Sequence, residues 1–449
     1  MTALWTSSDI AAATGGTASA DFAVEGVTFD SREVSADDLF VAMPGTATDG
    51  HKFVAGAFER GASGALVSQP VEGPHVLVAN VARGLEALGV AARARTEARI
   101  AGVTGSVGKT STKEALAAAL ARQPGVRVHR SVKSYNNHTG VPLSLSRMPA
   151  GSDYGVFEMG MNHAGEIAAL TRMVRPHVAL VTAIAPAHIE HLGSLEAIAD
   201  AKAEIFEGLE PGGTAIIPAD AAHADRMIAR AQDLGAAIVT FGDGGIVRAE
   251  DVYADARGTQ LTAHLLSGQV SVRIAQPGAH WVSNALAVLA TVEALGGDIG
   301  LAALALGELE GMAGRGARFQ AGGATIIDES YNANAASMAA TLKVLASEPG
   351  RHIAVLGEMR ELGVEGPALH AALAEPIIDA GVSHAILVGA GMQPLADALS
   401  GQVSVETVDS AETALDALKT VMHSGDAVLV KGSNGVGLGR LIAALKEEQ

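Results

Sequence analysis

The sequence contains no cysteine, and this absence removes several kinds of chemistry at once. Disulfides, thiolate nucleophiles and cysteine-based zinc sites are all excluded. Aromatic residues make up only 3% of the 449 residues, and no charge-free run of 18 apolar residues is present. We therefore expect no membrane span. The first residues also lack the basic stretch and apolar block of a signal peptide, so we expect a cytoplasmic protein.

Basic residues are outnumbered as well, because 31 Lys and Arg stand against 49 Asp and Glu, a formal net charge of −18 at pH 7. A mostly acidic surface repels nucleic acid and anionic membranes, so neither is expected as a partner. An anionic small molecule remains a possible substrate if a few cations gather in one cleft. The hydrophobic share of 48% excludes a disordered chain, and the length fits about two to three domains.

Short apolar runs alternate with helical stretches, which predicts parallel sheets with crossover helices. The central runs are IAGV after Arg99, YGVFEM (154–159), VALVTAI (178–184), TAIIP (214–218) and AAIVTF (236–241). After the Gly-rich segment 311–319 a second series begins, with ATIIDES, HIAVLGEM, HAILVGAG, SVETVD and DAVLVKGS. We therefore expect an α/β protein of three domains: a small α/β domain over 1–84, a central parallel-sheet domain over 85–314 and a doubly wound, Rossmann-like domain over 315–449.

The sharpest motif is TGSVGKTS (104–111), which follows an apolar run and opens a helical stretch. Such a loop turns backbone N–H groups inward, and the positive end of the helix faces a phosphate. Lys109 would reach the β- and γ-phosphates, and the Thr110 hydroxyl would bind Mg²⁺. The strict phosphate-loop pattern has a glycine where this chain has Val103, so the loop is a variant. The alternative, a glycine turn with an exposed lysine, fits the strand–turn–helix context less well.

Three other central residues are candidates for metal chemistry. Glu158 ends a strand-like run, where a carboxylate facing Mg²⁺ is expected beside a phosphate loop. His188 follows another run, although a loop histidine is more often a surface residue. Lys202 has only apolar neighbours at helical spacings of three and four. Lys202 either extends its amine to the surface or is buried with a lowered pKa. In the second case the neutral amine can add CO₂ and become an anionic carbamate.

The third domain offers polar residues at the ends of its expected strands. Asp328 ends one run and is followed by Tyr331 in a Tyr/Asn cluster, which suits a polar ligand or a plain turn before a helix. Arg315 lies in the Gly-rich segment, from which it could move onto a phosphate. Lys431 ends the last run and is either an anion ligand or a solvated lysine.

Taken together, these motifs resemble the Mur ligases of peptidoglycan synthesis over nearly the whole chain. FDSREVSADDLFVAMPG and DGHKF resemble the N-terminal domain of the later amino-acid-adding members. TGSVGKTSTKE, YNNHTGVPLSL, FEMGMNHAGEI, APAHIEHLGS and AKAEIF resemble the ATPase domain, and GRGARF, IIDESYNANAASM, LGEMRELG and LVKGS the C-terminal domain. YNAN and EM-x-ELG favour the branch that adds D-alanyl-D-alanine to UDP-N-acetylmuramoyl-tripeptide. The lysine- or diaminopimelate-adding members typically carry Tyr-Ala-His and DNP-type motifs, which are absent, and folylpolyglutamate synthetase lacks the N-terminal domain.

The resemblance implies a role for each residue that matches a family motif. ATP would be held by Gly105, Ser106, Val107, Gly108, Lys109, Thr110, Ser111, Asn284, Arg315, Asp328 and Tyr331. One Mg²⁺ ion would be bound by Thr110 and Glu158, and a second by His188 and the carbamate of Lys202. The catalytic set would be Lys109, Glu158, His188 and Lys202. The UDP-linked substrate would lie against Ser31, Arg32, Asn136, Asn137 and Thr139.

The chain departs from the family pattern at four positions, namely Ala183, Trp281, Ala335 and Asn434. The family usually has asparagine at the first two, proline at the third and arginine at the fourth. The missing arginine leaves a substrate anchor at position 434 in doubt, and Arg440 could replace it only if its helix points it inward.

The resemblance implies a cytoplasmic, monomeric ligase that uses ATP and forms an acyl phosphate before the amide bond. Closure of the third domain about the 311–316 hinge would exclude water from that anhydride. The alternatives are a Mur-type ligase for another amino acid, a nucleotide-controlled switch protein and a non-catalytic scaffold. The sequence lacks the [NT]-K-x-D guanine reader of a GTPase switch. The third residue of the tripeptide, diaminopimelate or lysine, is left open.

Overall fold

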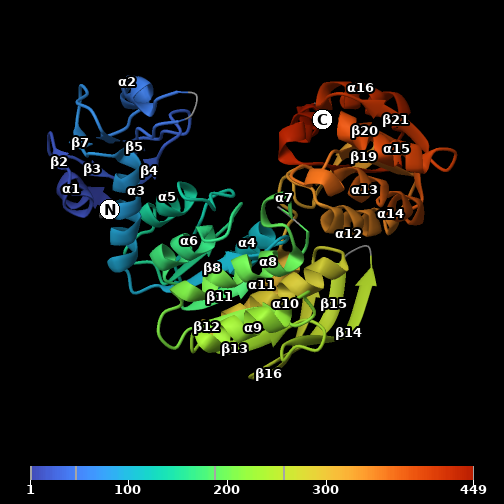
Figure 1. Cartoon of the computed structure of the whole chain (residues 1–449), viewed down its shortest axis with the longest axis horizontal. Coiled ribbons are helices and arrows are strands. Elements are labelled where there is room, and N and C mark those ends of the chain that lie inside the picture. Colours follow the sequence, from blue (N-terminus) through green and yellow to red (C-terminus); the bar gives the residue numbers. More distant parts are fainter. Residues whose placement is uncertain (1–2, 46–47, 187–188, 256–257, 448–449) are drawn as a thin grey trace.

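The N-terminal part of the computed structural model is a small sheet covered by helices (Figure 1). The structure describes residues 3–45, 48–186, 189–255 and 258–447. Strands β4 to β7 pair in parallel in the order β7-β6-β5-β4, and β2 joins the edge antiparallel. The elements are β1 (Trp5–Thr6), α1 (Ser7–Thr14), β2 (Thr17–Ala18), β3 (Ala23–Val24), β4 (Gly26–Thr28), β5 (Asp38–Val41), the 3₁₀ turn η1 (Gly50–Phe53), α2 (Val54–Glu59), β6 (Gly64–Val67), β7 (His75–Leu77) and α3 (Val81–Ala94).

The central part is built on a six-stranded, fully parallel sheet in the order β13-β12-β11-β8-β10-β9. Each central run expected from the sequence forms one of these strands. The elements are β8 (Arg99–Thr104), α4 (Lys109–Ala121), β9 (Val128–Arg130), α5 (Gly140–Ser146), β10 (Tyr154–Glu158), α6 (Glu166–Val174), β11 (Val178–Val181), α7 (Ile189–Leu192), α8 (Leu195–Ala203), η2 (Glu204–Gly208), β12 (Thr214–Pro218), α9 (Ala224–Asp233) and β13 (Ala237–Phe241).

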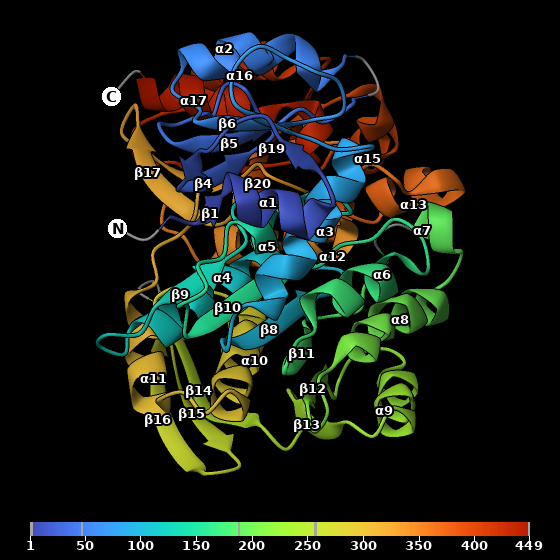
Figure 2. The same ribbon diagram turned by 90° about the vertical axis from the view of Figure 1, so that its left-hand side faces the viewer.

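A second, antiparallel sheet follows β13 and was not expected from the sequence. Its strands are β14 (Arg248–Asp255), β15 (Gly258–Leu265) and β16 (Gly268–Ile274), and two helices follow, α10 (Ala279–Ala294) and α11 (Ile299–Glu308). In both ribbon views this sheet lies beside α10 and α11 (Figures 1 and 2), and Ala254 of β14 lines a pocket together with Ala336 and Ala340 of the third part.

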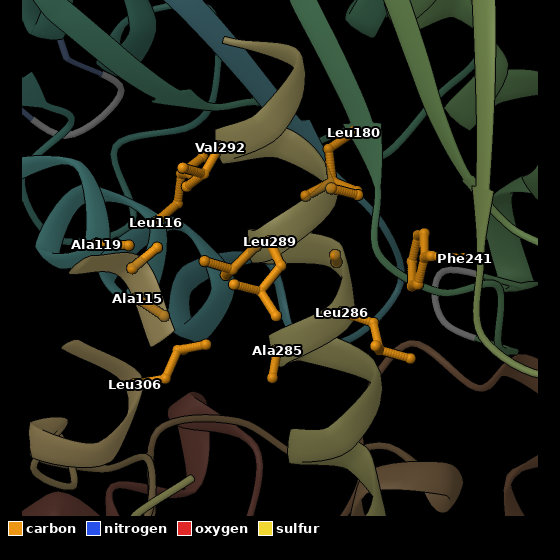
Figure 3. Close-up of a cluster of buried hydrophobic side chains, with 14 of the residues drawn as sticks. Ala115, Leu116, Ala119, Leu180, Phe241, Ala285, Leu286, Leu289, Val292 and Leu306 are labelled. Atoms are coloured by element: carbon orange, nitrogen blue, oxygen red, sulfur yellow. The ribbon is translucent and has the colours of Figure 1, made fainter. Parts of the chain in front are cut away.

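Helix α10 is the centre of the largest hydrophobic core. Leu286, Leu289 and Val292 on this helix face α4 and the sheet, where Leu116, Leu180 and Phe241 meet them (Figure 3). These side chains are at most 3% exposed. Because burying one such side chain stabilises a fold by about 1.5–3 kcal/mol, this core fixes α4 against the sheet. The helix that follows the phosphate loop is therefore held rigidly.

The third part is a six-stranded sheet in the order β17-β18-β22-β19-β20-β21, parallel except for β17. The five expected runs form the parallel strands, and β17 adds an antiparallel edge. The elements are β17 (Ala317–Ala321), β18 (Ala324–Glu329), α12 (Ala335–Ala346), β19 (His352–Gly357), η3 (Gly363–Glu365), α13 (Gly366–Ala371), α14 (Ala374–Asp379), β20 (Val382–Val388), η4 (Ala390–Met392), α15 (Gln393–Leu399), β21 (Ser404–Val408), α16 (Ala411–Val421), β22 (Ala427–Lys431), η5 (Asn434–Val436) and α17 (Leu438–Glu447).

The three parts confirm the expected α/β fold class with parallel sheets. The first and third parts lie as two lobes above the central one (Figure 1). Helix α3 continues through residue 84 and leads into β8, so the division at 84 falls inside a helix. We retain the divisions at 84 and 314 as a proposal. Within the described part of the chain, no helix is long and apolar enough to cross a membrane.

Candidate active site

The loop between β8 and α4 has the strand–turn–helix form that the sequence predicts. Gly105 has φ +146° and Gly108 φ +82°, conformations that side-chain-bearing residues rarely adopt. A Cβ at Gly105 would also lie 2.0 Å from the Thr182 Oγ1 atom. Gly108 precedes α4 and gives it no side-chain cap, so the first N–H groups of the helix remain available. Such a helix end is suited to a phosphate.

Lys109 and Ser106 add polar groups to this loop. The Lys109 ammonium donates a hydrogen bond to the Gly105 carbonyl at 2.6 Å. Burial lowers the pKa of Lys109, the positive charge of Arg315 lowers it further, and Glu158 opposes both. The Ser106 hydroxyl is buried without a hydrogen-bond partner among the described residues. A phosphate oxygen would satisfy this hydroxyl and the lysine together.

Oxygen ligands suitable for Mg²⁺ meet beside the loop. The Thr110 hydroxyl donates to Glu158 Oε2 at 2.7 Å, and Asn136 Nδ2 donates to Glu158 Oε1 at 2.7 Å. Glu158 is 1% exposed. Across the described residues no three His, Cys, Asp or Glu side chains converge. One carboxylate and one hydroxyl still fit Mg²⁺, because this ion is usually held by one or two carboxylates together with substrate phosphates.

Lys202 on α8 is buried, as its apolar helical neighbours indicate. It is 1% exposed, and its Nζ atom has no hydrogen-bond partner among the described residues. Burial holds its pKa well below the ordinary value, and the positive charge of Lys109 lowers it further. A buried ammonium without a partner is costly, so burial favours the neutral form of this amine. The structure thus excludes the alternative in which Lys202 extends to the surface.

The third part contributes a cation beside these groups. The Arg315 guanidinium carbon lies 4.1 Å from the centre of the Tyr331 ring, a cation–π contact. Its Nη2 atom lies 3.4 Å from the Ser134 hydroxyl, which is itself 3.4 Å from the Thr110 hydroxyl. Arg315 therefore connects the third part to the candidate metal site.

These groups line one cleft of about 590 Å³ between the central and third parts. It brings together most of the residues expected to bind nucleotide and metal. From the expected set, the lining includes Ser106, Val107, Gly108, Lys109, Thr110, Ser111, Asn136, Asn137, Glu158, Asn284, Arg315 and Tyr331.

Other expected residues lie away from this cleft wall. Asp328 is 1% exposed, and its carboxylate accepts hydrogen bonds from the Gly314 N–H at 2.8 Å and the Ser330 hydroxyl at 2.6 Å. It therefore holds the hinge and the turn that carries Tyr331. Thr139 donates to the Asn137 Oδ1 atom at 3.0 Å beside the cleft. His188 lies outside the described residues.

Ser31 and Arg32 lie in the N-terminal part and face a different surface. The Arg32 side chain is 84% exposed and pairs with Asp30 at 2.7 Å. The hydrogen bond from Arg32 lowers the pKa of Asp30 to about 2. The neighbouring Glu33 pairs with Lys133 of the central part. The segment with the expected UDP-substrate residues thus contacts the loop that leads to Asn136 and Asn137.

The four departures from the family pattern have separate locations. Ala183, Trp281 and Asn434 line the cleft, whereas Ala335 begins α12. Arg440 on α17 is 79% exposed and pairs with Glu412 at 3.1 Å. It points to α16, so it does not replace an arginine at position 434.

Several site residues were missed by the sequence analysis. Ser134, Thr182 and His280 line the cleft, and burial lowers the pKa of His280 to about 4. The Thr182 hydroxyl donates to the Val107 carbonyl at 2.5 Å and so fixes the phosphate loop. Lys113 is fully buried and donates to the Ser131 and Lys133 carbonyls at 2.7 and 2.8 Å. The available sequence signal for the burial of Lys113 was its place among the apolar positions of α4.

Family models cover most of the chain. The model described as "Mur ligase middle domain" matches residues 103–292, and "Mur ligase, glutamate ligase domain" matches residues 314–434. "Mur ligase family, catalytic domain" matches residues 23–133.

Relatives match over almost their whole length. The UDP-N-acetylmuramoyl-tripeptide–D-alanyl-D-alanine ligase of Escherichia coli is 35% identical, with 95% of each chain covered. The ligase of the same name from Rickettsia prowazekii is 32% identical over 98% of this chain and 99% of its own. A crystal structure of MurF from Acinetobacter baumannii superposes with a TM-score of 0.87 at 29% identity, covering 99% of both chains. The structure of MurF from Thermotoga maritima in complex with ADP superposes with a TM-score of 0.77 at 25% identity, covering 95% of this chain and 98% of its own. The chain therefore belongs to the Mur ligase family.

Proposed function

We propose that this enzyme joins D-alanyl-D-alanine to UDP-N-acetylmuramoyl-tripeptide and converts ATP to ADP and phosphate. The observation that carries this proposal is the full-length similarity to ligases of that name, combined with a cleft that holds Lys109, Thr110 and Glu158 together. We place the reaction in the cytoplasm, where ATP is available. We also propose that the enzyme is a monomer.

The first step activates a carboxylate, which is a poor electrophile at neutral pH. An oxygen of the tripeptide carboxylate attacks the γ-phosphorus of ATP, and ADP leaves. Lys109, the free N–H groups of α4 and the Arg315 guanidinium offset the negative charge that gathers on the transferring group. The product is an acyl phosphate.

The second step forms the amide. The neutral amine of the dipeptide attacks the acyl carbon, a tetrahedral intermediate forms, and phosphate leaves with loss of a proton from the amine. Water must be kept away because it would hydrolyse the acyl phosphate. The two-sided cleft, with Tyr331 and Arg315 of the third part opposite the phosphate loop, supports this exclusion.

We further propose that Thr110 and Glu158 hold one Mg²⁺ ion, and that Lys202 serves a second as a carbamate with His188. Mg²⁺ would supply charge stabilisation to the transferring phosphoryl group. The unpartnered amine of Lys202, whose pKa is lowered by burial, supports the carbamate, because the neutral form of an amine adds CO₂ and releases one proton. The resulting anion would be paired with Mg²⁺, which would offset the cost of burying its charge.

A competition assay tests the choice of acceptor. The enzyme receives ATP, Mg²⁺ and UDP-N-acetylmuramoyl-tripeptide, in both the diaminopimelate and lysine forms, with D-Ala-D-Ala, D-Ala, L-Lys and diaminopimelate at equal concentrations. We expect mainly the pentapeptide product, measured by mass. A mainly tetrapeptide product would contradict the dipeptide acceptor, and nucleotide turnover without any UDP-peptide dependence would contradict a ligase.

A further inference from the structure

The carboxyl edge of the third sheet is where an open α/β sheet binds its ligand. Strands β18, β22, β19 and β20 are neighbours and run in parallel, so their carboxyl ends lie side by side. Glu358 and Arg360 follow β19, and Ser433 follows β22. Asn434, the next residue, lines the main cleft. Charged groups at this edge therefore lie next to the cleft.

Among the cations near this edge, Arg360 has spare hydrogen-bonding capacity. Lys431 is 3% exposed in its side chain, donates to the Asn332 carbonyl at 2.9 Å and lies 3.5 Å from Glu329. The Arg360 side chain is 53% exposed, and within the described chain its one ion pair is a 3.4 Å contact from Nε to Glu358 Oε1. A guanidinium has five N–H donors, so at least four remain for a ligand.

The loop after β22 is shaped around this guanidinium. A Cβ at Gly435 would lie 2.1 Å from the Arg360 Nη1 atom, so the guanidinium occupies the space of a side chain at position 435. The Arg360 N–H donates to the Ser433 hydroxyl at 3.0 Å, and the Ser433 N–H donates to the Glu358 carbonyl at 3.3 Å. Backbone and side chain of Arg360 are thus both held against 433–435. Arg360 is not itself among the residues that line the cleft, but this contact places its guanidinium beside the 433–435 turn, whose Asn434 lines the cleft.

We propose that Arg360 binds the terminal carboxylate of the incoming D-alanyl-D-alanine and thereby selects a dipeptide over a single amino acid. This proposal rests on the function proposed above. When the attacking amine is neutral, the carboxylate is the only charge on the dipeptide, and a guanidinium can bind it with two parallel hydrogen bonds. Glu358 orients the guanidinium through Nε and leaves the outer N–H groups for the ligand.

The selectivity follows from length. An extended chain spans about 3.3–3.6 Å per residue, so the carboxylate of D-alanine lies one such step closer to its amine than that of the dipeptide. If the dipeptide spans the distance from the acyl phosphate to Arg360, the carboxylate of a single amino acid stops one residue length short of the guanidinium. It would also leave the guanidinium without its partner, which penalises the shorter acceptor.

The first test compares Arg360→Met with Arg440→Met, which removes an exposed arginine of the same domain that lies away from the cleft. Loss of a charge-assisted hydrogen bond predicts that Arg360→Met raises KM for D-Ala-D-Ala by about 10- to 100-fold. In Arg360→Met the KM values for ATP and the UDP-tripeptide should change by less than about threefold. In Arg440→Met the KM values for D-Ala-D-Ala, ATP and the UDP-tripeptide should all change by less than about threefold. Arg360→Lys should recover part of the loss because it restores the charge without the fork.

The second test removes the carboxylate from the acceptor. D-Ala-D-alaninamide carries an uncharged amide in its place, and the wild-type enzyme should use it about 10- to 100-fold less well in kcat/KM than D-Ala-D-Ala. Arg360→Met should use both acceptors within about threefold of each other. An Arg360→Met enzyme that discriminates as strongly as wild type would overturn the proposal.

Further outcomes distinguish a failure of the Arg360 assignment from a failure of the proposed ligase function. Gly435→Ala should displace the guanidinium and raise KM for D-Ala-D-Ala without removing any charge, and an unchanged KM would count against the assignment. A wild-type enzyme that forms no pentapeptide would overturn the proposed function itself. If the wild-type enzyme forms pentapeptide and the Arg360→Met enzyme forms it equally well, only the role of Arg360 would be overturned.

Discussion

Lys109 lines the cleft, and Lys202 is buried near enough for their charges to interact, but the two amines have different surroundings. The Lys109 amine has the Gly105 carbonyl as its partner and Glu158 nearby, whereas the Lys202 amine has no hydrogen-bond partner in the described chain. The positive charge of Lys109 also contributes to the lowered pKa of Lys202. One amine is suited to stay a cation on a phosphate, and the other to become an anion.

Replacement of Lys109 by alanine tests the first of these roles. A contact to a transferring phosphoryl group contributes about 3 kcal/mol or more, so ligation should fall by at least ~100-fold. Binding of the UDP-linked substrate, measured by calorimetry without ATP, should stay near wild type because we assign it mainly to the N-terminal part. Ligation at the wild-type rate would remove the phosphate loop from the mechanism.

Replacement of Lys202 by alanine tests the carbamate. Ligation should be lost, and added acetate or bicarbonate should restore part of it by placing an anion in the vacated space. Lys52→Ala, at an exposed lysine of the N-terminal part, serves as the control and should respond to neither anion. A Lys202→Ala enzyme with full activity would show that the buried amine has no part in the reaction.

At the scale of elements, strand β9 carries a half-buried histidine. The His129 Nε2 atom donates to the Ser144 carbonyl at 2.8 Å, and its ring centre lies 5.7 Å from that of Phe157. Burial lowers the pKa of His129 to about 4 from an ordinary value of 6.5. The strand is therefore stable with a neutral imidazole only.

This histidine predicts acid sensitivity. As pH falls from about 6.5 to about 4, the unfolded chain takes up a proton that folded His129 does not, so stability falls and about 3 kcal/mol is lost by the lower pH. His129→Gln should reduce this loss in urea unfolding measured across that range. His163→Gln, at a side chain that is 64% exposed, should leave the pH profile unchanged. An identical profile for His129→Gln and wild type would contradict the assignment.

Strands made of continuous apolar runs could be predicted from the sequence, whereas strands in which apolar and polar residues alternate could not. β10 (YGVFE) is almost entirely buried, and such strands read as apolar runs. β14 reads RAEDVYAD, with charges among short side chains, and Val252 and Tyr253 are exposed. An antiparallel strand with one solvated face gives no such run, so the β14–β16 sheet was missed.

The same limit applies to the site. Residues within one motif, such as Lys109 and Thr110, could be predicted because a loop and a helix start place them by local geometry. Arg360 could not, because its position depends on Gly435, which is distant in sequence and belongs to another strand end. Lys202 is intermediate, since its helical spacing left open both a buried amine and one extended to the surface, and did not predict the missing hydrogen-bond partner.

At the scale of the whole molecule, the first two parts are joined by buried contacts. The Trp5 indole donates to the Ser146 carbonyl at 2.8 Å, and the Arg95 guanidinium lies 3.4 Å from the centre of the indole ring. Arg147 donates to the Val27 carbonyl at 2.5 Å. The third part instead meets the central one at the lined cleft. We expect the first two parts to move as one body and the third to move against them.

Trp5→Ala tests this arrangement. Trp5 is 3% exposed, and truncation of such a side chain costs about 3–5 kcal/mol. We expect a separate, lower-temperature unfolding transition for the N-terminal part in calorimetry, together with a raised KM for the UDP-tripeptide. Phe53→Ala, at a side chain that is 42% exposed, should keep the wild-type trace. A Trp5→Ala enzyme with one unfolding transition at the wild-type temperature would contradict the proposal that Trp5 holds the N-terminal part against the central part.

The absence of cysteine has a practical consequence at a second point where the third part meets the central one. A Cβ at Gly363 would lie 3.3 Å from the Glu190 Cγ atom of α7, and the adjacent Val364 is 98% exposed. Thiols introduced at positions 190 and 364 would be the only two in the molecule, because the natural chain has none. A pair of fluorescent or spin labels attached there would report the separation of the central and third parts in single molecules during turnover, with no background labelling to remove.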